Sequence, residues 1–112
     1  MKRIVDTGIT QEMLTGDNHP ELKIGNKCYV VDDRQSTFKK IQDIQKDVNI
    51  DEEAKEIKML ELAFGTENAK EIINLDLTVE NYNHLIFCIM GAITNRDPKE
   101  IEEGAKKAAK NN

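Results

Sequence analysis

The stretch that decides the fold reads LDLTVENYNHLIFCIMGA at residues 75–92, and no other segment of this 112-residue chain is as long and as apolar. At about 100° per residue, its branched and aromatic side chains fall on one side of a helix. This stripe consists of Tyr82, Ile86, Ile89 and Ile93, with Leu85 and Ala92 on one flank and Val79 and Met90 on the other. Polar residues interrupt the first half, which a lipid-facing helix does not tolerate. We therefore expect the central helix of a small soluble core, capped by Thr78 and extending to Asn95.

Length and composition favour a single helical domain. A chain of this size buries a core without metal or disulfide support, and 33% charged residues with 4% aromatic residues are typical of helical proteins. The net charge is -5, so the chain lacks the basic surface that nucleic-acid binding needs. No apolar leader follows Met1, and the two cysteines show no paired pattern. We expect a cytoplasmic protein with free thiols and with no nucleic-acid or membrane partner.

The N-terminal third predicts a hairpin after an irregular segment. Residues 1–20 show no sustained period, so we expect a loosely ordered segment with at most a short strand at 2–6. Gly25-Asn26 then separates 22–24 from 27–31, which is rich in β-branched and aromatic residues. Glycine at the first central position supplies the positive φ of a type II′ turn. A lone hairpin is marginal in water, so helices should cover one of its faces.

Two helices are expected between the hairpin and Gly65. Asp32 or Asp33 caps the first helix, which ends near Asp47, and Asp51 caps the second. Gly65 should end the second helix in a left-handed conformation. The apolar faces consist of Phe38, Ile41, Ile44 and Val48 in the first helix, and of Ala54, Ile57, Leu60 and Phe64 in the second.

Two shorter helices are expected on either side of the central one. Thr66 caps the first of them, and Asp97-Pro98 with Glu100 is a strong start signal for the second. Their apolar residues are Ala69, Ile72 and Ile73 in the first, and Ile101, Ala105 and Ala108 in the second.

The predicted fold class is α+β, mainly α, with a small N-terminal β-hairpin packed on a four- to five-helix bundle. Residues 1–20 form the N-terminal segment, and residues 21–95 form the hairpin and the helical core. Residues 96–112 form a C-terminal helix that is either frayed or bound to a partner.

No group of residues predicts a catalytic, cofactor or metal site. His84 and Cys88 are four residues apart, so both could face one ion, with Cys28 of the hairpin as a third ligand. Zinc sites normally recruit three or four such residues, however, and no second Cys or His lies at ligand spacing. We therefore expect Cys88 to pack at the edge of the apolar stripe and His84 to face water on the opposite side. The acidic residues at 47–56 lack the alternating ligands of a calcium loop, and those at 32–33 are more typical of a cap than of a catalytic pair.

Some apolar positions are left over by the predicted core. Met59 and Leu62 lie about 80° to 140° around the helix from Ala54, away from its core stripe. One interpretation is that the last helix folds back over Met59 and Leu62 and closes the bundle. The other is that these positions meet a second copy of the chain or an apolar helix of a client. The residues predicted to bind a partner are Met59, Leu62, Ile101, Ala105 and Ala108.

The order of elements resembles the small tail assembly chaperones of long-tailed phages and prophages of Gram-positive bacteria. The resemblance covers residues 21–93 and rests on four segments, KCYVVDD, RQSTFKKIQDIQK, MLELAFGTENAKEI and LTVENYNHLIFCIMGAI. It implies a non-enzymatic role in the host cytoplasm. Such chaperones are thought to coat the tape measure protein, keep its apolar helices soluble, and recruit tail tube subunits that displace them.

Two other classes of function stay open at this point. The short turn at Gly65-Thr66 is compatible with a DNA-binding regulator of the helix-turn-helix type. The helix after this turn, however, carries Glu67 and Glu71 and only Lys70 to contact a phosphate. A small enzyme of unknown class is the second alternative.

Overall fold

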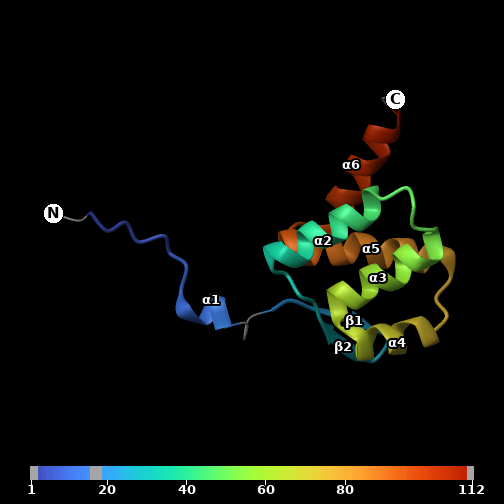
Figure 1. Cartoon of the computed structure of the whole chain (residues 1–112), viewed down its shortest axis with the longest axis horizontal. Coiled ribbons are helices and arrows are strands. Elements are labelled where there is room, and N and C mark those ends of the chain that lie inside the picture. Colours follow the sequence, from blue (N-terminus) through green and yellow to red (C-terminus); the bar gives the residue numbers. More distant parts are fainter. Residues whose placement is uncertain (1–2, 16–18, 111–112) are drawn as a thin grey trace.

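The computed structural model describes residues 3–15 and 19–110, and only the backbone of residues 108–110. The fold is α+β and mainly α: within these residues it contains six helices and one two-stranded sheet (Figure 1). The elements are α1 (Gln11–Thr15), β1 (Glu21–Ile24), β2 (Lys27–Val30), α2 (Gln35–Lys46), α3 (Glu52–Phe64), α4 (Thr66–Asn74), α5 (Val79–Thr94) and α6 (Pro98–Lys110).

The predicted hairpin is confirmed. β1 and β2 pair antiparallel, with Leu22 opposite Tyr29 and Ile24 opposite Lys27. Gly25 has a φ of +64°, as the first central position of a type II′ turn requires. Tyr29 is buried and contacts the Phe64 ring edge-on, with 6.1 Å between the ring centroids. The hairpin therefore lies on the helices through one face.

The core is built between the hairpin and three helices, α3, α4 and α5. Its buried residues are Tyr29, Val31, Leu60, Ala63, Phe64, Ala69, Ile72, Leu85 and Ile89. As predicted, Thr78 caps α5: its hydroxyl oxygen accepts a hydrogen bond from the backbone N–H of Asn81 at 3.1 Å. Ile89 is 2% exposed, but Val79 is 80% exposed, so its predicted place on the flank of the core is wrong. The first turn of α5 borders an open pocket with α3 and α4, and there Val79 stays exposed.

α2 begins later than predicted. Its N-cap is Arg34, and neither Asp32 nor Asp33 caps the helix. The reason is a tertiary contact: the backbone N–H of Asp32 donates to the carbonyl of Ala63 at the end of α3, at 2.8 Å, and holds the chain extended. The helix ends before Asp47, as predicted. Val48 lies beyond this end and is 90% exposed, so its predicted core position is wrong.

α3 and α4 share one glycine between them. The carboxylate of Asp51 caps α3 as predicted, accepting from the N–H of Ala54 at 2.8 Å. Gly65 has a positive φ of 87°, but its ψ of 160° is extended, so the expected left-handed cap is wrong. This extended residue lets α4 start at once, and Thr66 is its first helical residue and not its cap.

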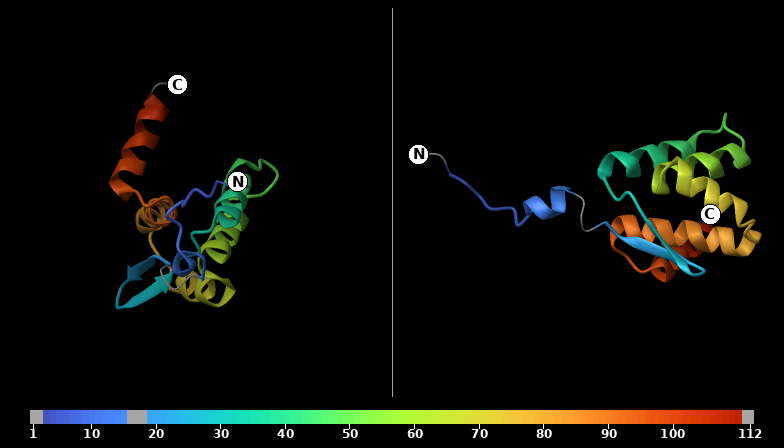
Figure 2. Two further views of the ribbon diagram at one scale, coloured as in Figure 1. Left: turned by 90° about the vertical axis from the view of Figure 1, so that its left-hand side faces the viewer. Right: turned by 90° about the horizontal axis from the view of Figure 1, so that it is seen from below.

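The two ends of the chain lie outside the compact core. Figures 1 and 2 show residues 3–15 running away from the helices, and α6 projecting from the bundle in a different direction. Residues 3–6 form no strand, so the expected short strand is wrong for them, and Lys2 is outside the described residues. The start of α6 is as predicted, since the carboxylate of Asp97 accepts from the N–H of Lys99 at 2.9 Å. No helix in the described part of the chain is both long and apolar enough to cross a membrane.

Candidate protein-binding surface

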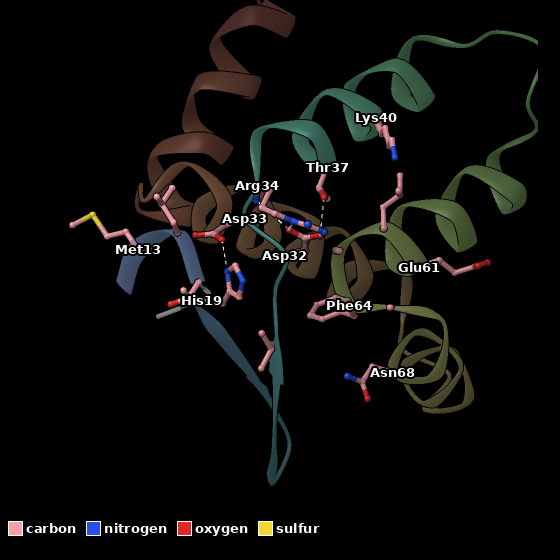
Figure 3. Close-up of a pocket in the computed structure, with 16 residues that line it drawn as sticks. Met13, His19, Asp32, Asp33, Arg34, Thr37, Lys40, Glu61, Phe64 and Asn68 are labelled. Carbon is pink, nitrogen blue, oxygen red and sulfur yellow. Dashed lines mark hydrogen bonds and ion pairs between the residues drawn. The ribbon is translucent and has the colours of Figure 1, made fainter. Parts of the chain in front are cut away.

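A cavity of about 780 Å³ lies where the loop between β2 and α2 meets the end of α3 (Figure 3). Its polar lining includes Asp32, Asp33 and His19. The two carboxylates do not face each other. Asp33 contacts the Nδ1 atom of His19 at 2.6 Å, and Asp32 turns towards α2. The geometry therefore offers no pair of carboxylates that share a proton.

Asp32 is the centre of a hydrogen-bond network that fixes the start of α2. Its Oδ1 accepts from the backbone N–H and the Nε of Arg34, at 3.1 and 2.9 Å, and its Oδ2 accepts from Arg34 Nη2 and the Thr37 hydroxyl, each at 2.8 Å. Thr37 is itself buried. The hydrogen bonds from Arg34 hold the pKa of Asp32 well below its ordinary value. The side chain thus serves to position a helix, and both its oxygens are already occupied.

This network predicts a pH-dependent contribution to stability. Asp32 binds a proton less tightly in the folded chain than in the unfolded chain, so its contribution is fully present above the unfolded pKa of about 4 and is lost as the pH falls further. We expect Asp32→Asn to lower the free energy of unfolding by about 1 kcal/mol at pH 7. Urea unfolding at pH 7 and at pH 3 measures the difference between the two proteins. A difference that is as large at pH 3 as at pH 7 would contradict the assignment.

His84 and Cys88 lie together on one face of α5. The Sγ of Cys88 is 3.5 Å from the Nε2 of His84, so the expectation that His84 lies on the opposite side is wrong. Burial raises the pKa of the Cys88 thiol. In β2, Cys28 lies opposite Lys23 and is exposed. The next residue, Tyr29, points to the other face of the hairpin and is buried in the core. No group of three or more histidine, cysteine or acidic side chains comes together among the residues that the structure describes.

The two thiols carry a second prediction. We expect Cys28→Ser to change stability little because its side chain is exposed, and Cys88→Ser to cost about 1 kcal/mol because it is half-buried. We expect neither variant to affect partner binding. Urea unfolding measures the stability, and elemental analysis of the purified protein measures bound metal. One equivalent of zinc per chain would overturn the prediction that the chain binds no metal.

The predicted partner-binding residues fall into different environments. Met59 is 7% exposed, so the expectation of a free surface there is wrong: α2 packs against α3, and Met59 and Ile41 are both buried. Leu62 is half-buried, as is Ile101, and Ala105 is exposed. The side chain of Ala108 is outside the described part of the chain. α6 packs against α5, so the interpretation in which α6 covers Met59 and Leu62 is also wrong.

Another surface with exposed apolar side chains lies between α3, α4 and the start of α5. We call it the acidic-rimmed groove, and its volume is about 330 Å³. Its apolar lining includes Ile57, Ile73, Leu77, Val79 and Tyr82, and its acidic residues are Glu53, Glu56 and Asp76. Ile57, Ile73 and Val79 are exposed to solvent. The groove was not predicted from the sequence, because the periodicity places these three residues on the core faces of their helices.

The charges around this groove are not neutralised by neighbours. Glu53, Glu56 and Asp76 take part in none of the ion pairs between described residues. On the groove lining, burial raises the pKa of Tyr82 above its ordinary value, and its hydroxyl makes no hydrogen bond to the described part of the chain. The groove therefore combines an apolar lining with three free carboxylates.

Comparison of the chain with models of protein families, with curated proteins and with solved structures gives no significant match.

Proposed function

We propose that this chain is a non-enzymatic assembly chaperone of the kind found in long-tailed phages and prophages of Gram-positive bacteria. The observation that carries the proposal is the acidic-rimmed groove. A chaperone for assembly intermediates has to present apolar surface to its client while it stays soluble itself. Here exposed Ile57, Ile73 and Val79 lie within a chain whose net charge is -5, which keeps such a surface in solution.

The shape and charge of the groove define the client segment that it suits. Three helices border it, and its lining is apolar, which is the arrangement that receives the apolar face of a helix. Carboxylates at the rim favour a segment with lysine or arginine beside its apolar residues. In the proposed role, this segment belongs to the tape measure protein, and tail tube subunits displace the chaperone during assembly in the host cytoplasm.

The proposal makes a genetic and a biochemical prediction. The gene should lie between a tail tube gene and a very long tape measure gene. Co-expression of the chain with the product of that long gene should then yield a soluble complex, whereas the long protein alone should precipitate.

A pair of valine variants tests whether the groove is the client site. Val79→Glu places a charge in the apolar lining and should abolish co-purification with the client. Val48→Glu is the matched control, because Val48 is also largely exposed and lies outside the groove. Both variants should keep the unfolding midpoint of the original chain within error. Equal loss of the client in both variants, or in neither, would contradict the proposal that the groove binds it.

A further inference from the structure

The β-hairpin leaves the main chain of β1 unpaired along its outer edge. The backbone N–H of Val31 donates to the carbonyl of Pro20 at 2.8 Å, so these two residues form a hydrogen-bonded pair. Antiparallel strands alternate such pairs with pairs that exchange no hydrogen bond, and by the observed register Lys23 and Cys28 form one of the latter. The main-chain N–H and C=O groups of Lys23, and likewise of Glu21, therefore point away from β2.

A groove of about 350 Å³ follows this outer edge, between β1 and α5. Its lining includes Leu22, which packs towards the core, and Lys23, which lies on the exposed face of the hairpin, but no residue of β2. A cavity that touches both faces of β1 and no part of β2 lies at the outer edge of β1. Figure 2 shows β1 beside α5, in agreement with the contacts between these two elements. We call this cavity the edge groove.

The edge groove offers three kinds of contact to a ligand. Part of its lining is apolar: Leu85 is buried, and Leu22 and Leu77 are half-buried. Lys23 supplies a positive charge that takes part in none of the ion pairs between described residues. The edge of β1 supplies main-chain donors and acceptors, which an extended segment is able to pair with. A helix cannot pair with them, because its own main-chain groups are already hydrogen-bonded.

We propose that β1 accepts an extended segment of another protein as an antiparallel third strand, and that this segment alternates aliphatic with acidic side chains. Side chains of a strand alternate between its two faces, so every second residue of the segment points to the leucines of the edge groove. The residues between them lie on the face of Lys23, where carboxylates are favoured. The edge groove shares only Leu77 with the acidic-rimmed groove. The two sites therefore take segments of different conformation and charge.

A synthetic peptide of about six residues that alternates valine and glutamate, blocked at both ends, is the probe. When it is added to the isotope-labelled full chain, the NMR amide signals of Glu21 and Lys23 should shift, and their exchange with solvent should slow. A peptide that alternates valine and lysine is the control, and it should bind roughly tenfold or more weakly. Equal binding of the two peptides, or signals of Glu21 and Lys23 that do not move, would overturn the proposal.

Methylation of single peptide amides tests the main-chain pairing without any change to the protein. Residues directly opposite each other in antiparallel strands share a face, so the direct partner of Lys23 is a glutamate whose N–H points to β1. A methyl group on that nitrogen should weaken binding by roughly tenfold or more, because it removes the donor and blocks the approach of the strands. A methyl group on the nitrogen of the next valine points outward and should change binding little. Equal effects of the two methyl groups, or the reverse order, would overturn the proposed pairing.

A matched pair of proline variants tests the same pairing from the side of the protein. Lys23→Pro removes a main-chain donor at the outer edge of β1, and Cys28→Pro removes the equivalent donor of β2, directly opposite. Neither N–H takes part in the pairing of the hairpin, and edge strands tolerate proline at such positions. Lys23→Pro should lose the valine–glutamate peptide, whereas Cys28→Pro should bind it like the original chain.

Two further measurements complete the test of the proline variants. Lys23→Ala removes the charge but keeps the donor, so it should bind the peptide more tightly than Lys23→Pro does. Circular dichroism verifies that each variant is folded, and for a variant that is not, the methylated peptides still decide. Equal binding of the peptide by Lys23→Pro and Cys28→Pro would overturn the proposal.

This inference and the proposed function fail separately. Lys23→Pro leaves the lining of the acidic-rimmed groove unchanged, so this variant should still co-purify with the client. Loss of the peptide with retained client binding supports both proposals. Retained peptide binding in Lys23→Pro overturns strand addition alone.

Discussion

Replacing Ile89 by alanine is expected to lower the free energy of unfolding by about 2 to 5 kcal/mol. Ile89 is 2% exposed and belongs to the core cluster that joins α5 to the hairpin, α3 and α4. The truncation removes three carbon atoms from a site enclosed by several elements, so the lost burial is accompanied by a cavity that the surroundings fill only in part. A loss of this size is a large fraction of the stability of a small domain.

Urea unfolding followed by circular dichroism measures this effect. Val79→Ala is the matched control, because Val79 lies on the same helix but is 80% exposed, and its truncation should change the free energy of unfolding by about 0.5 kcal/mol or less. The comparison of the two variants also tests the position of Val79, which was predicted on the flank of the core but is exposed in the structure. Similar losses for the two variants would mean that the start of α5 is buried after all.

Features that depend on a few neighbouring residues were predictable from the sequence. The caps of α3 and α5 at Asp51 and Thr78 follow from side chains that reach an amide one turn away. The hairpin follows from one glycine between two β-prone runs, and the start of α6 from Asp97 before Pro98. In each case the interaction lies within a few residues, so the tertiary structure does not have to be known.

Features that depend on distant residues were not predictable. Asp32 and Asp33 have the composition of a cap, but the hydrogen bond from Asp32 to Ala63 delays the helix, and no local pattern shows this contact. Periodicity placed Ile57 in a core stripe and Met59 outside it, and the structure has the reverse. A helix that packs on two sides has no single apolar face, so its sequence does not show which side stays free.

The candidate site illustrates the same limit. A groove bordered by three helices exists only after α3, α4 and α5 have packed, and its residues are scattered from Glu53 to Asn83. For residues 1–20, the sequence predicted a loosely ordered segment and no binding surface.

Gly91→Ala is expected to destabilise the chain by about 1 to 3 kcal/mol, although alanine is the better helix former. Gly91 is buried in the last turns of α5, where the chain reverses through Asn95 in the left-handed conformation. The backbone N–H of Arg96 donates to the carbonyl of Gly91 at 2.9 Å, which brings the Arg96 carbonyl back over the helix. A Cβ atom at Gly91 would lie 2.6 Å from that oxygen and 3.2 Å from Pro98 Cγ. Because the first of these is a backbone atom, the whole turn into α6 has to shift.

Gly104→Ala is expected to have the opposite effect on stability. Gly104 is a helical residue of α6 with no atom within 4 Å of an added Cβ, so alanine there should raise the free energy of unfolding by up to about 1 kcal/mol. Urea midpoints that move in opposite directions for the two substitutions would establish that the turn at Arg96 selects glycine at position 91. A midpoint that rises for Gly91→Ala as it does for Gly104→Ala would mean that α6 does not fold back against α5 in this way. The position of α6 decides where Ile101 and Ala105 lie. This pair of substitutions therefore also tests whether α6 packs on the rest of the fold or projects from it as a separate helix.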